Sequence, residues 1–97
     1  MIDGKYAVSI DLPIGRFKGI LKLITNGTEV TGYIETMGKQ SPFSGGIATG
    51  NQFSFSGDFK TIIGNIKYKI TGIVNGDKLE IDAITNNGNF KIDGYRM

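Results

Sequence analysis

The chain has 97 residues, of which 39% are hydrophobic, and it carries a net charge of +2 with neither cysteine nor histidine. This length is typical of one domain, and the apolar content is sufficient for a packed core. The composition excludes disulfides, thiolate and histidine metal sites, and the Ser/His and Cys/His nucleophile pairs of many hydrolases.

Apolar and polar residues alternate with a period of two along almost the whole chain, as in strands that bury one face. Turn signals separate the alternating runs, and Asn26-Gly27 and Asn75-Gly76 favour type I′ hairpins, because both central residues of that turn need positive φ. No stretch has a helical period. We predict strands over residues 5–12, 17–25, 29–36, 40–48, 52–60, 65–74, 78–85 and 89–96.

Every link between the predicted strands is short, so each strand is expected to pair with the next one. Closing such a meander removes both free edges. The sequence therefore predicts one all-β domain over residues 1–97, an eight-stranded antiparallel up-and-down β-barrel. A gapless self-match at an offset of 49 residues further predicts two four-strand halves, about 2–49 and 51–97.

Glycine occurs once in the inward-facing row of most predicted strands. Inward glycines let the strands of a small, strongly coiled barrel bend and give opposing large side chains room, although they can also mark β-bulges. These positions are Gly19, Gly32, Gly45, Gly57, Gly72 and Gly94.

Gly4-Lys5-Tyr6 begins the first predicted strand, and Arg96 ends the last one. In the calycins, which include lipocalins and streptavidin-type barrels, a Gly-x-Trp begins the first strand and a basic residue of the last strand packs across that Trp. The chain resembles this arrangement, with Tyr6 in place of the Trp. The resemblance implies that Tyr6 and Arg96 close one end of the barrel, whereas the lack of Trp argues against an avidin-like biotin pocket.

The turns at the opposite end carry apolar side chains at their tips, with cations beside them. Apolar side chains are unusual on water-facing turns and are typical of a pocket mouth or a contact surface. The sequence does not choose between these two roles. The candidate ligand-binding residues of this mouth are Ile14, Arg16, Met37, Lys39, Ile62 and Ile63.

No residue set in the chain indicates catalysis, because the carboxylates mostly occupy outward strand positions without forming a buried pair. We therefore expect a protein that is not an enzyme and has no metal or cofactor. The lysines are spread singly along the strands, which is not typical of a nucleic-acid-binding stripe. The chain start lacks the pattern of a signal peptide, and no apolar run is long enough to cross a membrane as a helix, so we expect a cytoplasmic protein.

Two functions remain open from the sequence. Eight-stranded barrels are just wide enough to be filled by side chains or to hold one small ligand. The first interpretation is therefore a barrel that binds a small, mainly apolar ligand with a polar tip near Arg16 or Lys39. The alternative is an accessory or assembly module with a filled barrel, acting as a homodimer or with a protein partner. Its contact face would contain outward Ile20, Ile24, Tyr33, Ile73, Ile84 and Tyr95.

Overall fold

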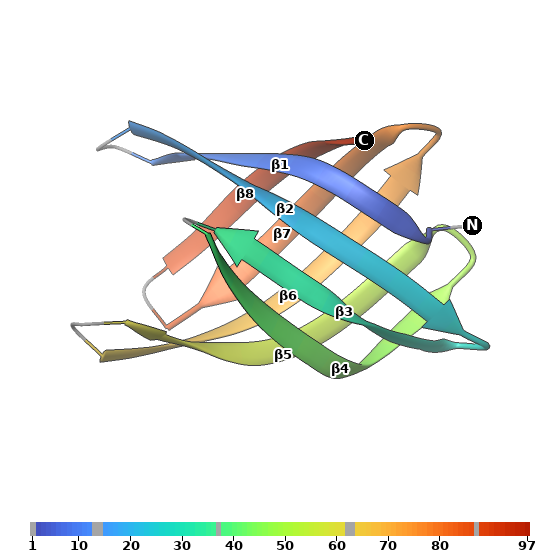
Figure 1. The fold of residues 1–97 in the computed structure, drawn as a ribbon, viewed down its shortest axis with the longest axis horizontal. Helices are drawn as coiled ribbons and strands as arrows, with labels where there is room; N and C mark the ends of the chain where they lie inside the picture. Colours follow the sequence, from blue (N-terminus) through green and yellow to red (C-terminus); the bar gives the residue numbers. More distant parts are fainter. Residues whose placement is uncertain (1, 13–14, 37, 62–63, 87) are drawn as a thin grey trace.

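The computed structural model describes residues 2–12, 15–36, 38–61, 64–86 and 88–97 (Figure 1). These residues form eight strands whose ends lie within two residues of the predicted ones. The strands are β1 (Gly4–Leu12), β2 (Gly15–Asn26), β3 (Glu29–Thr36), β4 (Lys39–Thr49), β5 (Gln52–Thr61), β6 (Gly64–Asn75), β7 (Lys78–Thr85) and β8 (Gly88–Arg96).

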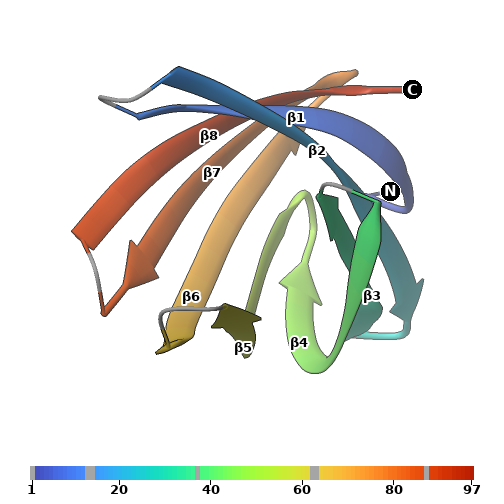
Figure 2. The same ribbon diagram turned by 60° about the vertical axis from the view of Figure 1, so that its left-hand side comes forward.

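The strands form a closed barrel in which each strand pairs with the next and β8 returns to β1 (Figure 2). Every pairing is antiparallel, and Tyr6 lies opposite Arg96 in the pairing that closes the barrel. The prediction of an eight-stranded antiparallel up-and-down barrel is therefore confirmed. The turns after β2, β4 and β6 lie at one end with both termini, which we call the closed end; we call the opposite end the open end.

Backbone hydrogen bonds link neighbouring hairpins around the closed end. The carbonyl of Thr28 accepts from the amide of Ala48, that of Asn51 accepts from Val74, and that of Asp77 accepts from Arg96, at 2.8, 2.9 and 2.7 Å. Each turn carbonyl thus binds a strand of the following hairpin. These bonds satisfy backbone groups that have no partner within the strand ladders, so main-chain hydrogen bonds connect neighbouring hairpins at the closed end.

The most deeply buried side chains lie toward the closed end. Tyr6, Leu23, Val30 and Leu79 are completely buried, and Ile2 is 2% exposed. These positions belong to alternating inward rows, and burying an apolar side chain of this size contributes about 1.5–3 kcal/mol. The closed half of the barrel is therefore a packed core.

A β-bulge in β4 corrects one detail of the sequence analysis. Val30 pairs with Gly46 and Gly32 pairs with Phe43, so Ser44 and Gly45 together lie opposite the single residue between Val30 and Gly32. Gly45 is exposed, with a φ of 75°, and the buried inward position belongs to Gly46 instead. Gly45 was predicted to face inward and is a bulge residue, because the extra residue shifts the alternation by one.

Beyond the bulge, β4 and β5 separate toward the open end. Only three pairs join the described parts of these strands, from Ile47↔Ser54 to Thr49↔Gln52, whereas ten pairs join β5 to β6. Figures 1 and 2 both show the two strands diverging. We call this region the β4–β5 seam. Pro42 pairs with Tyr33 of β3 but lies in the part of β4 that has no pairing with the described residues of β5, and its lack of an N–H suits such an edge.

The ladder registers repeat at the predicted offset of 49 residues. Leu12 pairs with Gly15, and Thr61 pairs with Gly64; Asn26 pairs with Glu29, and Asn75 with Lys78. This correspondence continues through the third hairpin of each half until the β4 bulge. Whether the two halves superpose in three dimensions stays a prediction.

Candidate functional site

A cavity of about 520 Å³ lies in the open half of the barrel. Its described lining comes from β1, β2, β3, β4, β6, β7 and β8, so the cavity occupies the lumen and not one side of the barrel. The lining residues are Val8, Ser9, Ile10, Phe17, Lys18, Gly19, Ile34, Thr36, Lys39, Ser41, Ile66, Tyr68, Ile70, Ala83, Thr85 and Ile92.

The wall of the cavity is mainly apolar and incompletely packed. Ile10, Ile34, Ile66 and Ile92 face inward, yet each is only half-buried, in contrast to the completely buried residues at the closed end. Inward apolar side chains that remain half exposed are in contact with empty space or solvent. This end of the lumen therefore presents apolar surface that a small molecule can cover.

Four aromatic side chains form a cluster in the lumen, and one of them, Tyr68, lines the cavity. The rings of Phe43 and Phe55 are stacked with their centroids 3.7 Å apart, and Phe53 lies 6.2 Å beyond Phe55. Tyr68 meets Phe55 edge to face at 6.1 Å. Phe43 and Phe55 come from β4 and β5, so ring stacking joins these strands close to the point where their ladder ends.

Glycines opposite the rings make room for this cluster. A Cβ on Gly57 would lie 2.4 Å from the Tyr68 hydroxyl oxygen, and a Cβ on Gly72 would lie 2.4 Å from the Phe53 ring. Gly57 and Tyr68 are ladder partners, as are Phe53 and Gly72. Each ring therefore lies over the glycine of the neighbouring strand, which supports the prediction that inward glycines make room for large side chains.

Lys39 and Arg16, which the sequence assigned to the mouth, have different surroundings. Lys39 lines the cavity, whereas Arg16 is not among its described lining residues. The Arg16 guanidinium forms an ion pair with Asp11, with Nε 2.7 Å from Oδ1. This contact lowers the pKa of Asp11 and raises that of Arg16. Ile14, Met37, Ile62 and Ile63 lie outside the described residues.

The isoleucines of the cavity wall have no sequence signal beyond the alternation of their strands. Alternation identifies the inward face of each strand, but it does not show which end of the lumen is left unfilled. The polar lining residues Thr36, Ser41 and Thr85 carried no sequence signal of their own. Ladder registers were needed to bring them to one rim, because Thr36 and Ser41 come from β3 and β4, whereas Thr85 comes from β7.

Tyr6 and Arg96 are in contact at the closed end of the barrel. The Arg96 guanidinium carbon lies 4.9 Å from the centroid of the Tyr6 ring, within cation–π distance. Arg96 Nη1 donates to the carbonyl of Asp3, and Nε lies 3.6 Å from Asp77 Oδ1. The Tyr6 hydroxyl donates to the carbonyl of Ile2 at 2.6 Å, and burial raises the pKa of Tyr6. One side chain thus joins the last strand to the first.

Asp3 provides a further link at this end. Its carboxylate accepts hydrogen bonds from the backbone amide of Thr25, at 3.0 Å, and from the Thr25 hydroxyl. These bonds favour the ionised form and hold the pKa of Asp3 below its usual value. The N-terminal segment and β2 are therefore connected by a contact that depends on pH.

A second hollow, of about 580 Å³, lies over the outward rows of β4 to β8. Ile47 and Ile73 contribute to it beside charged side chains, and Lys91 lies 3.7 Å from Asp82 across the β7–β8 ladder. Ile47, which is 61% exposed, was not in the predicted outward set because the β4 bulge reverses its direction. This hollow is more polar than the lumen and lies on the open outer surface.

Neither a metal site nor a membrane-spanning helix is found in the part of the chain that the structure describes. No group of three or more acidic side chains there is arranged to hold a metal ion. No described helix is long and apolar enough to cross a membrane.

Comparison with known proteins identifies the fold and not the family. No family model matches the chain, and no curated protein matches it. Among solved structures, it is similar to a redesigned β-barrel with a TM-score of 0.66 and 13% sequence identity, over 99% of this chain and 91% of the other. This likeness supports the barrel architecture alone.

Proposed function

We propose that this protein is a non-catalytic, calycin-like β-barrel that binds a small, mainly apolar ligand in the open half of its lumen. The observation that carries the proposal is the cavity of about 520 Å³ with a largely apolar wall. Pockets for small molecules have volumes of roughly 300–1,000 Å³ and combine an apolar lining with a few polar groups. The hydroxyls of Thr36 and Ser41 provide such groups, whereas the Thr85 hydroxyl donates to the Gly88 carbonyl.

The architecture also supports access from one direction. Hairpin hydrogen bonds, the packed core and Arg96 occupy the closed end, and the aromatic cluster fills part of the lumen. A ligand therefore reaches the cavity from the open end, where the β4–β5 seam also diverges. We propose a cytoplasmic location, no enzymatic activity and no nucleic-acid or membrane partner.

A fluorescence titration tests the proposal. N-phenyl-1-naphthylamine is uncharged, apolar and brighter in apolar surroundings, so wild-type protein should bind it with saturation at one probe per chain. Ala83 is buried in the cavity wall, and Ala83→Phe should fill the space and abolish the signal. Ala7→Phe is the matched control, because it adds the same ring to an exposed position of β1.

The accessory-module alternative has its own support in the aromatic cluster, which fills part of the lumen. Exposed apolar side chains are also present on the outer face, including Ile24, Ile84 and Tyr95. Under this alternative, wild-type protein does not bind the probe, and sedimentation velocity shows a dimer. Probe binding that survives in Ala83→Phe but is lost in Ala7→Phe would likewise refute a luminal site.

A further inference from the structure

The inward row of β4 changes from charged to apolar with depth. Thr36 pairs with Lys39, Ile34 with Ser41, and Gly32 with Phe43. Directly opposite residues of a ladder share a face, so Lys39 belongs to the same inward row as Ser41 and the buried Phe43. Lys39 is exposed, Ser41 is half-buried, and Phe43 is 7% exposed. Along this row an ammonium group and then a hydroxyl line the cavity, and the next inward residue is a buried aromatic ring of the core.

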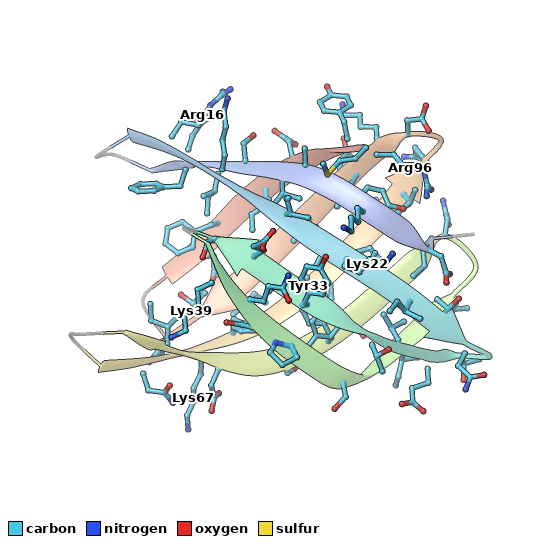
Figure 3. The ribbon with its side chains drawn as sticks, in the orientation of Figure 1. Arg16, Lys22, Tyr33, Lys39, Lys67 and Arg96 are labelled. Carbon is cyan, nitrogen blue, oxygen red and sulfur yellow. The ribbon has the colours of Figure 1, made fainter. Side chains whose placement is uncertain are left out.

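Of the described cations at the open end, Lys18 and Lys39 line the cavity, but Lys18 lies between the inward residues Phe17 and Gly19 and so belongs to an outward row. Phe17 and Ile66 line the cavity, so their neighbours Arg16 and Lys67 lie on the opposite face of their strands. Figure 3 places Arg16, Lys39 and Lys67 at the same end of the barrel, with Arg96 at the other. Lys39 therefore differs from its neighbours in being both cationic and part of an inward row.

No opposite charge neutralises Lys39 in the described part of the chain. None of the ion pairs found there includes it, whereas Arg16 is paired with Asp11 and Lys91 with Asp82. The described lining of the cavity contains no carboxylate. The rim of an otherwise apolar cavity therefore carries an unneutralised positive charge, which favours an anionic group on the ligand.

Resting on the proposed function, we propose that the ligand is an amphiphile with one anionic head group, whose apolar part fills the cavity and whose head binds Lys39 at the rim. The head stays in contact with water, so the ion pair forms without the desolvation cost of a buried pair. The hydroxyls of Thr36 and Ser41 can donate further hydrogen bonds to the same head. A cationic head would be repelled at this position.

Two fluorescent probes that differ by one sulfonate test this proposal. 8-Anilinonaphthalene-1-sulfonate has the ring system of N-phenyl-1-naphthylamine and adds a single negative charge. We expect wild-type protein to bind the anionic probe more tightly than the neutral one. Lys39→Gln should raise the dissociation constant of the anionic probe about fivefold, as for the loss of one solvent-exposed ion pair. The dissociation constant of the neutral probe should change less than about 1.5-fold, since its contacts are apolar.

Lys67→Gln is the matched control, because it removes one positive charge from the same end but from an outward row. It should leave the ratio of the two dissociation constants unchanged. A second arm uses non-fluorescent competitors of equal length, and dodecanoate should displace the neutral probe at lower concentration than dodecanol in wild type but not in Lys39→Gln.

The outcomes separate the two proposals. If both probes bind wild-type protein and Lys39→Gln weakens them equally or not at all, the anionic head group is refuted while the luminal site stands. If Lys67→Gln weakens binding of the anionic probe as much as Lys39→Gln does, the effect comes from the overall positive charge of the open end, and the specific role of Lys39 is refuted. If neither probe binds wild-type protein, the proposed function fails and this inference fails with it.

Discussion

Replacing Arg96 should lower the free energy of unfolding more than replacing the exposed Arg16, because Arg96 joins the last strand to the first. Its cation–π contact with Tyr6 contributes about 0.5–2 kcal/mol. Its hydrogen bond to the Asp3 carbonyl contributes about 1.5–3 kcal/mol. The ion pair with Asp77 adds little, since the Asp77 side chain is 84% exposed. These contributions share one side chain and do not simply add, so we expect Arg96→Ala to cost about 2–3 kcal/mol.

Urea unfolding followed by circular dichroism measures this loss as a difference in the free energy of unfolding at constant m-value. Arg16→Ala is the matched control, because the Arg16 side chain is 61% exposed and its partner Asp11 is 72% exposed. It should leave the unfolding midpoint almost unchanged. A double-mutant cycle of Arg96→Ala with Tyr6→Leu isolates the contact with the ring and should give a coupling of about 0.5–2 kcal/mol. A coupling near zero, or equal losses in the Arg96 and Arg16 variants, would refute a closing role for Arg96.

Three further predictions concern the rest of the barrel. Gly32→Ala should lower the free energy of unfolding in urea by about 3 kcal/mol or more, because its Cβ would lie 1.8 Å from the Lys22 carbonyl oxygen. Gly76→Ala is the control: a Cβ there meets open space at a φ of 62°, and the loss should be about 1 kcal/mol. Equal losses in the two variants would contradict the steric argument. Asp3→Asn should lower the free energy of unfolding at pH 7, and this loss should disappear as the pH falls below the usual carboxyl pKa of 3.8. The reason is that the contact that lowers the pKa of Asp3 stabilises the fold only while the carboxylate is ionised. A difference in stability between variant and wild type that persists at pH 2 would indicate a packing effect instead. Backbone amides that face the β4–β5 seam should exchange with deuterium faster than those of the β5–β6 ladder, and equal protection would indicate a closed seam.

The sequence predicted the barrel well because its signals are local. Alternation marks the inward row of each strand, and Asn-Gly at 26–27 and 75–76 places two hairpins within a residue of their observed positions. The position of the β4 bulge was not predictable in this way. Ser44-Gly45-Gly46 offers two glycines, and alternation alone does not decide which of them takes the left-handed conformation. The exposed direction of Ile47 was missed for the same reason.

The candidate site was predicted only in outline, because a cavity depends on how distant strands face one another. The apolar turn tips predicted a mouth at the open end, and Lys39 lines the cavity there. Arg16 was equally plausible from the sequence, but its strand turns it outward, and Asp11 neutralises it. The half-buried isoleucines of the wall come from four different strands, and nothing in their local sequence distinguishes them from core residues.

Methyl NMR tests most directly whether the ligand binds inside the open half of the lumen. With isoleucine δ1-methyl labelling, titration with N-phenyl-1-naphthylamine should shift the signals of Ile10, Ile34, Ile66 and Ile92, which line the cavity. The signals of Ile2 in the closed core and of Ile24 and Ile84 on the outer face should stay in place. Shifts confined to Ile24, Ile47 and Ile84, with the cavity signals unmoved, would contradict a luminal site and favour a contact surface on the outside of the barrel.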